Sequence, residues 1–89
     1  MNTADKKRLK AQAHTLKPVI MIGNAGLTDA VLAEIEIALD SHELIKIRIR
    51  AERDIRAQIS DQICINTHAE LIQRIGQISV VYRHNPNKL

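Results

Sequence analysis

The sequence predicts a single α/β domain, a four-stranded mixed sheet packed with helices, with its elements in the order α-β-α-β-α-β-β. Three observations support this prediction. The chain has 89 residues, the length of one domain. Segments with apolar residues at helical spacing alternate with short runs rich in isoleucine and valine, so strands linked through helices run parallel. The last two runs are separated only by Gly76-Gln77, which is typical of an antiparallel hairpin with a type II′ turn.

The composition limits both the core and the compartment. Phenylalanine and tryptophan are absent and Tyr82 is the single aromatic residue, so isoleucine, leucine and valine must form the core. The one cysteine, Cys64, excludes an internal disulfide and fits a reducing compartment. The basic start has no apolar segment behind it, and no stretch approaches the ~18 apolar residues of a membrane span. We therefore expect a cytoplasmic protein without a membrane partner.

The first helix is expected to run from a Thr3 N-cap to about His14. Leu9 and Ala13 fall at helical spacing and would pack inward. Basic residues recur every four positions beside that apolar edge, at Lys6, Lys10 and His14. Such a stripe can follow a phosphate backbone, although lysines also simply make a surface helix soluble.

The next stretch combines a stop, a strand, a glycine turn and a helix start. Pro18 ends the first helix because it lacks an N–H group. Val19–Ile22 is an unbroken apolar run, typical of a strand covered on both faces. Gly23 and Gly26 permit a turn that another molecule can approach closely, and Thr28 is a suitable N-cap. This layout favours a phosphate cradle, but a plain strand-to-helix connection has the same pattern.

A second helix is expected from about Thr28 or Asp29 to Ser41. Its predicted buried face consists of five apolar residues, Val31, Leu32, Ile35, Ala38 and Leu39. Its remaining surface is acidic through Glu34, Glu36 and Asp40, which would repel a nucleic acid. Only the helix N-terminus is then a plausible contact, and there Asp29 competes with a phosphate for the helix dipole.

The following strand shows the clearest alternation in the chain. Ile45, Ile47 and Ile49 would point toward one face. The opposite face would carry Leu44, Lys46, Arg48 and Arg50. We expect Arg53 and Arg56 to extend this basic patch into a third helix, residues 54–66, which would be buried through Ile55, Ile59 and Ile63. Strands at about 70–75 and 78–83 complete the sheet.

Basic and acidic residues are grouped along the chain. Residues 1–17 hold five basic residues against one acid, and residues 44–56 hold five against two. Between these blocks, residues 18–43 contain five acids and neither lysine nor arginine. The distribution favours one cationic and one acidic face, although an ordinary solvated surface is also compatible with it.

The sequence lacks recognisable catalytic or metal-binding motifs. There is no Walker loop, dinucleotide fingerprint, His-Glu-x-x-His helix or Cys-x-x-Cys pair. The four histidines are scattered, at His14, His42, His68 and His84. We therefore expect no catalytic residues, no metal, no cofactor, no small-molecule substrate and no enzymatic activity. An acid–base ribonuclease or a small phosphatase is an alternative, because the residues of such sites converge in space and not in sequence.

Several short motifs occur in a characteristic order. They are Ala13-His14-x-Leu16-Lys17-Pro18, Ile22-Gly23-x-x-Gly26-Leu27-Thr28, His42-Glu43-Leu44-Ile45-Lys46-Ile47, and Ile75-Gly76 before Tyr82-Arg83. This order resembles the CRM domain, whose name refers to chloroplast RNA splicing and ribosome maturation, and especially its stand-alone bacterial form, the YhbY group. The resemblance extends from the first helix to Arg83.

The resemblance implies an RNA-binding domain over residues 1–84, similar to the C-terminal domain of translation initiation factor three. The segment 85–89, which begins Asn85-Pro86-Asn87, is expected to be a short flexible tail. The resemblance also implies a role on ribosomal RNA of the large-subunit precursor, with the glycine loop acting like the backbone-clamping loop of KH domains. Between the glycines, Asn24-Ala25 departs from loops that carry a basic residue. The residues expected to contact RNA are Lys6, Lys7, Lys10, His14, Lys17, Gly23, Asn24, Ala25, Gly26, Thr28, Lys46, Arg48 and Arg50. The alternative is a protein-interaction module with incidental RNA contact.

Overall fold

The computed structural model describes residues 1–87 and contains three helices and four strands. The elements are α1 (Thr3–Ala13), β1 (Ile20–Ile22), α2 (Asp29–His42), β2 (Leu44–Ile49), α3 (Arg53–Thr67), β3 (Glu70–Ile75) and β4 (Ile78–Tyr82). Their order confirms the predicted α-β-α-β-α-β-β arrangement.

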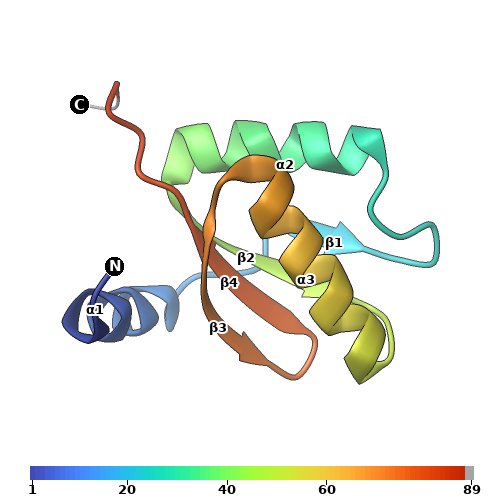
Figure 1. The fold of residues 1–89 in the computed structure, drawn as a ribbon, viewed down its shortest axis with the longest axis horizontal. Coiled ribbons are helices and arrows are strands. Elements are labelled where there is room, and N and C mark those ends of the chain that lie inside the picture. Colours follow the sequence, from blue (N-terminus) through green and yellow to red (C-terminus); the bar gives the residue numbers. More distant parts are fainter. Residues whose placement is uncertain (88–89) are drawn as a thin grey trace.

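The strands form one mixed sheet in the order β1-β2-β4-β3, as Figure 1 shows. β1 and β2 run parallel, whereas β4 is antiparallel to both β2 and β3. β4 therefore lies between β2 and β3, the two strands that α3 connects in the chain. In the hairpin turn, φ is +55° at Gly76 and is not positive at Gln77. A positive φ at the first turn residue alone is what a type II′ turn requires.

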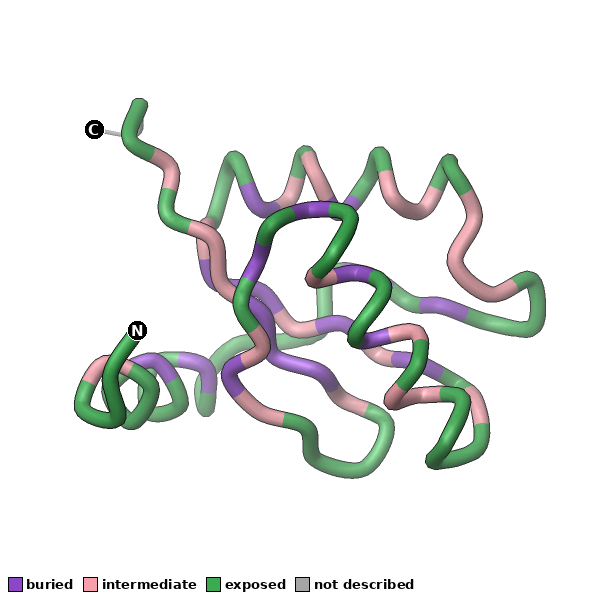
Figure 2. The backbone as a smooth tube through the Cα atoms, viewed as in Figure 1, coloured by how far each residue is buried: buried purple, intermediate pink, exposed green. Residues whose placement is uncertain are grey.

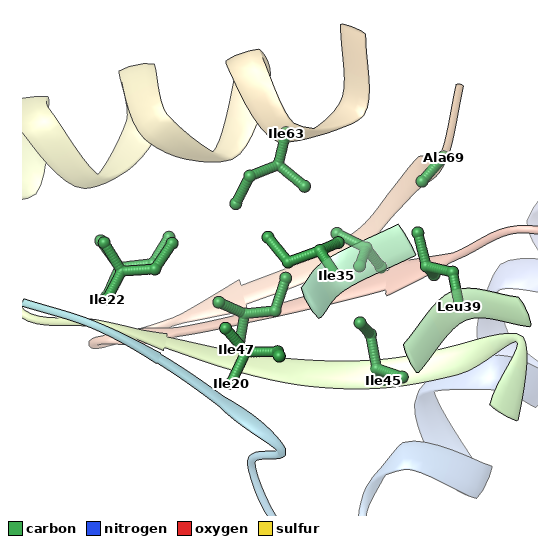
Figure 3. Packing of buried hydrophobic residues seen from close by; sticks show 10 residues of the cluster. Ile20, Ile22, Ile35, Leu39, Ile45, Ile47, Ile63 and Ala69 are labelled. Carbon is green, nitrogen blue, oxygen red and sulfur yellow. The ribbon is translucent and has the colours of Figure 1, made fainter. Parts of the chain in front are cut away.

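The main core lies between one face of the sheet and helices α2 and α3. Ile45, Ile47 and Ile49 all point into it, which confirms the alternation predicted for β2. Figure 3 shows Ile22, Ile35 and Ile63 converging on this layer from different elements. The buried members are Ile20, Ile22, Ile35, Leu39, Ile45, Ile47, Ile49, Ile63, Ala69 and Val81.

Helix α1 packs on the opposite face and covers only part of it. Its Leu9 and Ala13 are buried in a smaller cluster with Leu44, Ile72 and Val80. Beyond this cluster the same face is open to solvent, because Met21 is 56% exposed and Ile75 is 61% exposed. In Figure 2 most of the outward surface of α1 and the loop after β1 are also exposed.

The start of α1 and the strand after it correct two predictions. The N-cap of α1 is Asn2, whose side-chain oxygen accepts a hydrogen bond from the Asp5 N–H at 2.8 Å, whereas Thr3 is already helical. The predicted cover on both faces of β1 is wrong for the face that carries Met21. β1 is an edge strand, and α1 does not reach this part of the sheet. The predicted Thr28 N-cap is confirmed by its hydroxyl, which accepts from Val31 N–H at 3.2 Å.

The buried side of α3 also differs from the prediction. Ile63 is fully buried, but Ile55 is 44% exposed, and Ser60 and Thr67 are buried instead. Each four-residue step overshoots a full turn of 3.6 residues by about 40°, so Ile55 lies about 80° around the helix from Ile63. The Thr67 hydroxyl is satisfied by donating to the Ile63 carbonyl at 2.7 Å.

One arginine joins the ends of α2, α3 and β4. The Arg83 guanidinium donates to Glu36 Oε2 at 2.7 Å, Asp40 Oδ1 at 2.9 Å and the Thr67 carbonyl at 2.8 Å. We call these four residues the arginine clasp. Burial lowers the pKa of Arg83, but the hydrogen bonds and charges of Glu36 and Asp40 outweigh burial and raise it.

The predicted tail begins beside this clasp. The Asn85 backbone N–H donates to Glu43 Oε2 at 2.7 Å, and its side-chain amide donates to the Asp40 carbonyl at 3.0 Å. Residues 88–89 lie outside the described residues, so the flexibility of the 85–89 segment stays a prediction.

Candidate nucleic-acid interface

The sheet face that α1 leaves uncovered carries one residue from each strand in a continuous row. Met21 pairs with Arg48, Arg48 with Ile78, and Ile78 with Ile75. Since paired residues project from the same side of a sheet, these four side chains lie next to one another. We call this surface, together with Lys46 and Gln73, the open face. It combines two cations with exposed apolar side chains.

The two basic segments predicted from the sequence meet beside this row. Lys10 of α1, the C-cap residue His14 and Lys46 of β2 line one cavity of about 170 Å³. The other lining residues are Ala13, Gln73, Ile75, Ile78 and Val80. Within residues 1–87, the lining therefore has two lysines and a histidine but no carboxylate. This arrangement suits an anion, because nothing in the cavity neutralises the lysines.

Arg48 is half-buried and lacks a complete set of partners. Its Nε is buried and donates no hydrogen bond to any residue in the described chain. Its neighbours across the strands, Met21 and Ile78, are apolar and cannot accept one. A buried donor without an acceptor is costly, so the protein itself does not fully satisfy the Arg48 guanidinium.

The glycine loop is compact and faces solvent. The Gly26 N–H donates to the Gly23 carbonyl at 3.0 Å, which closes a tight turn, and Gly26 has a φ of 72°. A Cβ added at Gly23 would meet no atom of the protein within 4 Å. Internal packing therefore does not require glycine at position 23, and a bare backbone there leaves room for another molecule.

Arg50 lies at the base of this loop. Its backbone N–H donates to the Ile22 carbonyl at 2.9 Å, and Ile22 immediately precedes Gly23. Asn24 and Ala25 are exposed at the turn itself. The structure thus places one exposed arginine next to a loop that has no cation of its own.

Other predicted contact residues are not drawn into the same cavity. Lys6 and Lys7 are exposed on α1 without an ion pair among the described residues. Lys17 lines a separate groove with Leu16 and Val19. The Thr28 hydroxyl is already used to cap α2.

The predicted extension of the patch into α3 is wrong. Arg53 and Arg56 line a cavity on the opposite face of the sheet, together with Arg74 of β3. Sequence reasoning did not include Arg74, because its pairing with Ser79 and its approach to α3 are long-range features. It also missed Gln73, which a register shift in β3 places on the open face directly after Ile72.

The described residues offer little to a metal ion or a nucleophilic mechanism. No group of three or more metal-ligating side chains occurs within residues 1–87. Burial raises the pKa of the Cys64 thiol, and the nearby charges of Asp61 and Glu70 raise it further. A raised pKa disfavours the reactive thiolate.

The fold and its cation-lined sheet face define a small α/β domain with a surface suited to anions. The chain belongs to the CRS1/YhbY (CRM) domain family, whose profile matches residues 1–83. Within residues 1–87, which the structure describes, no helix is long and apolar enough to cross a membrane.

Several bacterial relatives carry descriptive names. A protein of Pseudomonas aeruginosa named as a probable RNA-binding protein is 48% identical over 82 residues, which are 91% of this chain and 79% of that protein. A protein of Haemophilus influenzae named as an RNA-binding protein is 48% identical over 84 residues, 93% of this chain and 85% of that one. The solution structure of a hypothetical Staphylococcus aureus protein, proposed to bind RNA, matches with a TM-score of 0.85 and 29% identity, covering 99% of this chain and 94% of that one.

Proposed function

We propose that this protein binds RNA through the open face of its sheet. The observation that carries the proposal is the cavity in which Lys10, His14 and Lys46 meet without a carboxylate among the described residues. Two segments separated by more than thirty positions of the chain supply these groups, so local sequence alone does not explain their convergence. Each lysine that neutralises a phosphate also releases counterions, which favours binding.

The glycine loop positions the RNA backbone in this proposal and contributes little of the attraction. Its exposed turn offers backbone groups and the Asn24 amide, whereas Arg50 beside it supplies charge. Family membership supports ribosomal RNA of the large-subunit precursor as the partner. The names of the relatives support RNA binding in preference to enzymatic activity.

The composition of the open face favours recognition of shape and backbone over base sequence. Tyr82 is the only Phe, Tyr or Trp in the chain, so the protein has no platform of several such rings on which bases could stack. The apolar side chains of Met21, Ile75 and Ile78 can contact sugars and base surfaces next to Arg48. Arg48 adds a half-buried cation to the same surface.

A second candidate is a protein-interaction module. An apolar groove of about 400 Å³ between the end of α1 and the start of β2 supports it, with exposed Leu16 and Val19 among its lining residues. Such a module would keep its partner after nuclease treatment of a pulldown, whereas a complex held together by RNA would be lost.

The proposal is tested by filter binding of ribosomal RNA fragments across a salt series. If four phosphates are contacted, log affinity against log salt should slope by about −3 to −4. The double variant Lys10→Gln with Lys46→Gln should weaken binding about tenfold and reduce the steepness of that slope by about 1.5.

The matched control is Arg8→Gln, because Arg8 is an exposed α1 cation that already pairs with Asp5 at 3.8 Å. It should change affinity less than twofold. Equal losses in both variants, or a complex insensitive to salt, would contradict binding through this face. Hydrolysis of the RNA during the assay would instead indicate that the protein is an enzyme.

A further inference from the structure

A second cluster of cations lies on the opposite side of the sheet from the open face. Arg53 and Arg56 from the first turns of α3 and Arg74 from β3 line a cavity of about 490 Å³. Asp54 and the buried Ser79 also border it. We call this cavity the arginine pocket. It contains three guanidinium groups and one carboxylate.

The arginines of the pocket are not neutralised by the protein. Within residues 1–87, ion pairs with carboxylates involve Arg8, Arg83 and His84, and none involves Arg53, Arg56 or Arg74. Arg56 is held in place, since its Nη1 donates to the Ala51 carbonyl at 2.7 Å. Arg53 and Arg74 are exposed and keep their donors available. Three unpaired cations around one cavity repel one another, and a bound anion would relieve that repulsion.

The pocket lies at the same end of the sheet as the glycine loop. The Ile49 N–H donates to the Gln77 carbonyl at 2.7 Å, which fixes the hairpin turn beside the end of β2. The next residue, Arg50, bonds to Ile22 at the base of the loop. The glycine loop, the hairpin turn and the start of α3 thus lie at the same end of the sheet, as Figure 1 shows.

We propose that the arginine pocket is a second phosphate site for the same RNA, which passes from the open face around the hairpin turn to the α3 side of the sheet. This inference rests on the proposed function. Guanidinium groups bind phosphate oxygens through paired N–H donors, so arginine suits this role better than lysine. The phosphate is either an internal phosphodiester or the 5′-terminal phosphate of the RNA.

The test uses the double variant Arg53→Gln with Arg74→Gln, which leaves Arg56 and its bond to Ala51 intact. Binding is measured with RNAs of about six and about 18 nucleotides, one near the lower limit and one beyond the upper limit of the ~4–16 nucleotides that a single OB-fold domain covers. The long RNA should lose about tenfold in affinity, and its salt slope should become less steep by about 1.4 for two lost contacts. The short RNA, which the open face can hold alone, should change less than twofold.

A second variant separates charge from a folding defect. Arg53→Lys with Arg74→Lys should restore the salt slope but only part of the affinity, because lysine lacks the two-pronged donor geometry. Comparing long RNAs with a 5′-hydroxyl and a 5′-phosphate distinguishes the two sources of phosphate. A loss confined to the phosphorylated RNA assigns the pocket to the terminal phosphate, and an equal loss assigns it to the internal backbone.

The outcomes also separate this inference from the proposed function. If the Lys10/Lys46 variant weakens both RNAs while the Arg53/Arg74 variant weakens neither, the second site is overturned and binding through the open face stands. If the Lys10/Lys46 variant weakens neither RNA, the proposed function itself fails.

Discussion

The two ends of the sheet use arginine in opposite ways. Where β2 begins and β4 ends, Arg83 donates to two carboxylates and to the Thr67 carbonyl, so the protein satisfies it. Where β1 and β2 end, Arg50, Arg53 and Arg74 have no carboxylate partner among the described residues. Paired cations tie elements together, whereas unpaired cations at one edge repel one another unless an anion binds.

This difference separates stability from binding in space. The arginine clasp connects the ends of α2, α3 and β4, and the acids that satisfy it also place negative charge at that end. The opposite end has the glycine loop and the arginine pocket, in which cations outnumber carboxylates. Substitution of the paired Arg83 at the first end should therefore change stability alone, and substitution of the unpaired arginines at the second end should change RNA affinity alone.

The largest expected effect is on stability at the clasp. Arg83→Met should lower the free energy of unfolding by about 2 kcal/mol, because it leaves the Thr67 carbonyl and two carboxylates without their donor. The loss is limited because the Glu36 and Asp40 side chains are 44% and 67% exposed, so water replaces part of the lost interaction. Urea denaturation followed by circular dichroism measures the change.

The matched control for this prediction is Arg74→Met. Arg74 is exposed and unpaired, so its loss should change stability by less than about 0.5 kcal/mol while weakening RNA binding. Equal destabilisation by the two variants would contradict the proposed difference between the two ends of the sheet. A loss of RNA affinity by folded Arg83→Met protein would also contradict it.

An intermediate effect is expected at the start of α2. Thr28→Ala removes the hydroxyl that accepts from the Val31 N–H and should cost about 1 kcal/mol of stability. Thr28→Ser keeps an oxygen there and should retain most of that stability. If the hydroxyl serves the cap and not the RNA, RNA affinity at a temperature where all variants are folded should be the same. A specific loss of binding in Thr28→Ala would restore Thr28 to the contact surface.

Local patterns in the sequence predict most of the fold. The strict alternation from Ile45 to Ile49, the break at Pro18 and the turn at Gly76 each depend on neighbouring residues, and the structure confirms the elements that they predict. The exposure of Met21 could not be predicted in this way. An unbroken apolar run is typical of a strand buried on both faces, and only the partial reach of α1 leaves this one uncovered.

The candidate site was predictable in its residue types but not in its geometry. Helical spacing identifies Lys10 and His14, and strand alternation identifies Lys46, but their meeting in one cavity depends on where α1 crosses the sheet. The arginine pocket depends on the approach of α3 to the hairpin, which no local pattern contains. Residues brought together by tertiary packing therefore account for most of what the sequence did not predict.

The smallest expected effect concerns how the glycine loop works. A Cβ at Gly23 would meet no protein atom, so Gly23→Ala, Gly23→Asn and Gly23→Asp should all fold normally. If the loop acts by letting the RNA backbone approach closely, Gly23→Asn and Gly23→Asp should each weaken binding about threefold, or about 0.7 kcal/mol, with little change in salt slope. Asparagine and aspartate have nearly the same shape and differ in charge, so their comparison isolates the steric contribution.

The contrasting outcome would assign the loop a different role. If only Gly23→Asp weakens binding, and its effect disappears at high salt, the loop lies near phosphate without touching it. Affinity at this end of the sheet would then come from Arg50 and the arginine pocket, and the glycine turn would serve only to connect β1 with α2. A loss shared by the asparagine and aspartate variants requires contact, because salt cannot screen a steric clash.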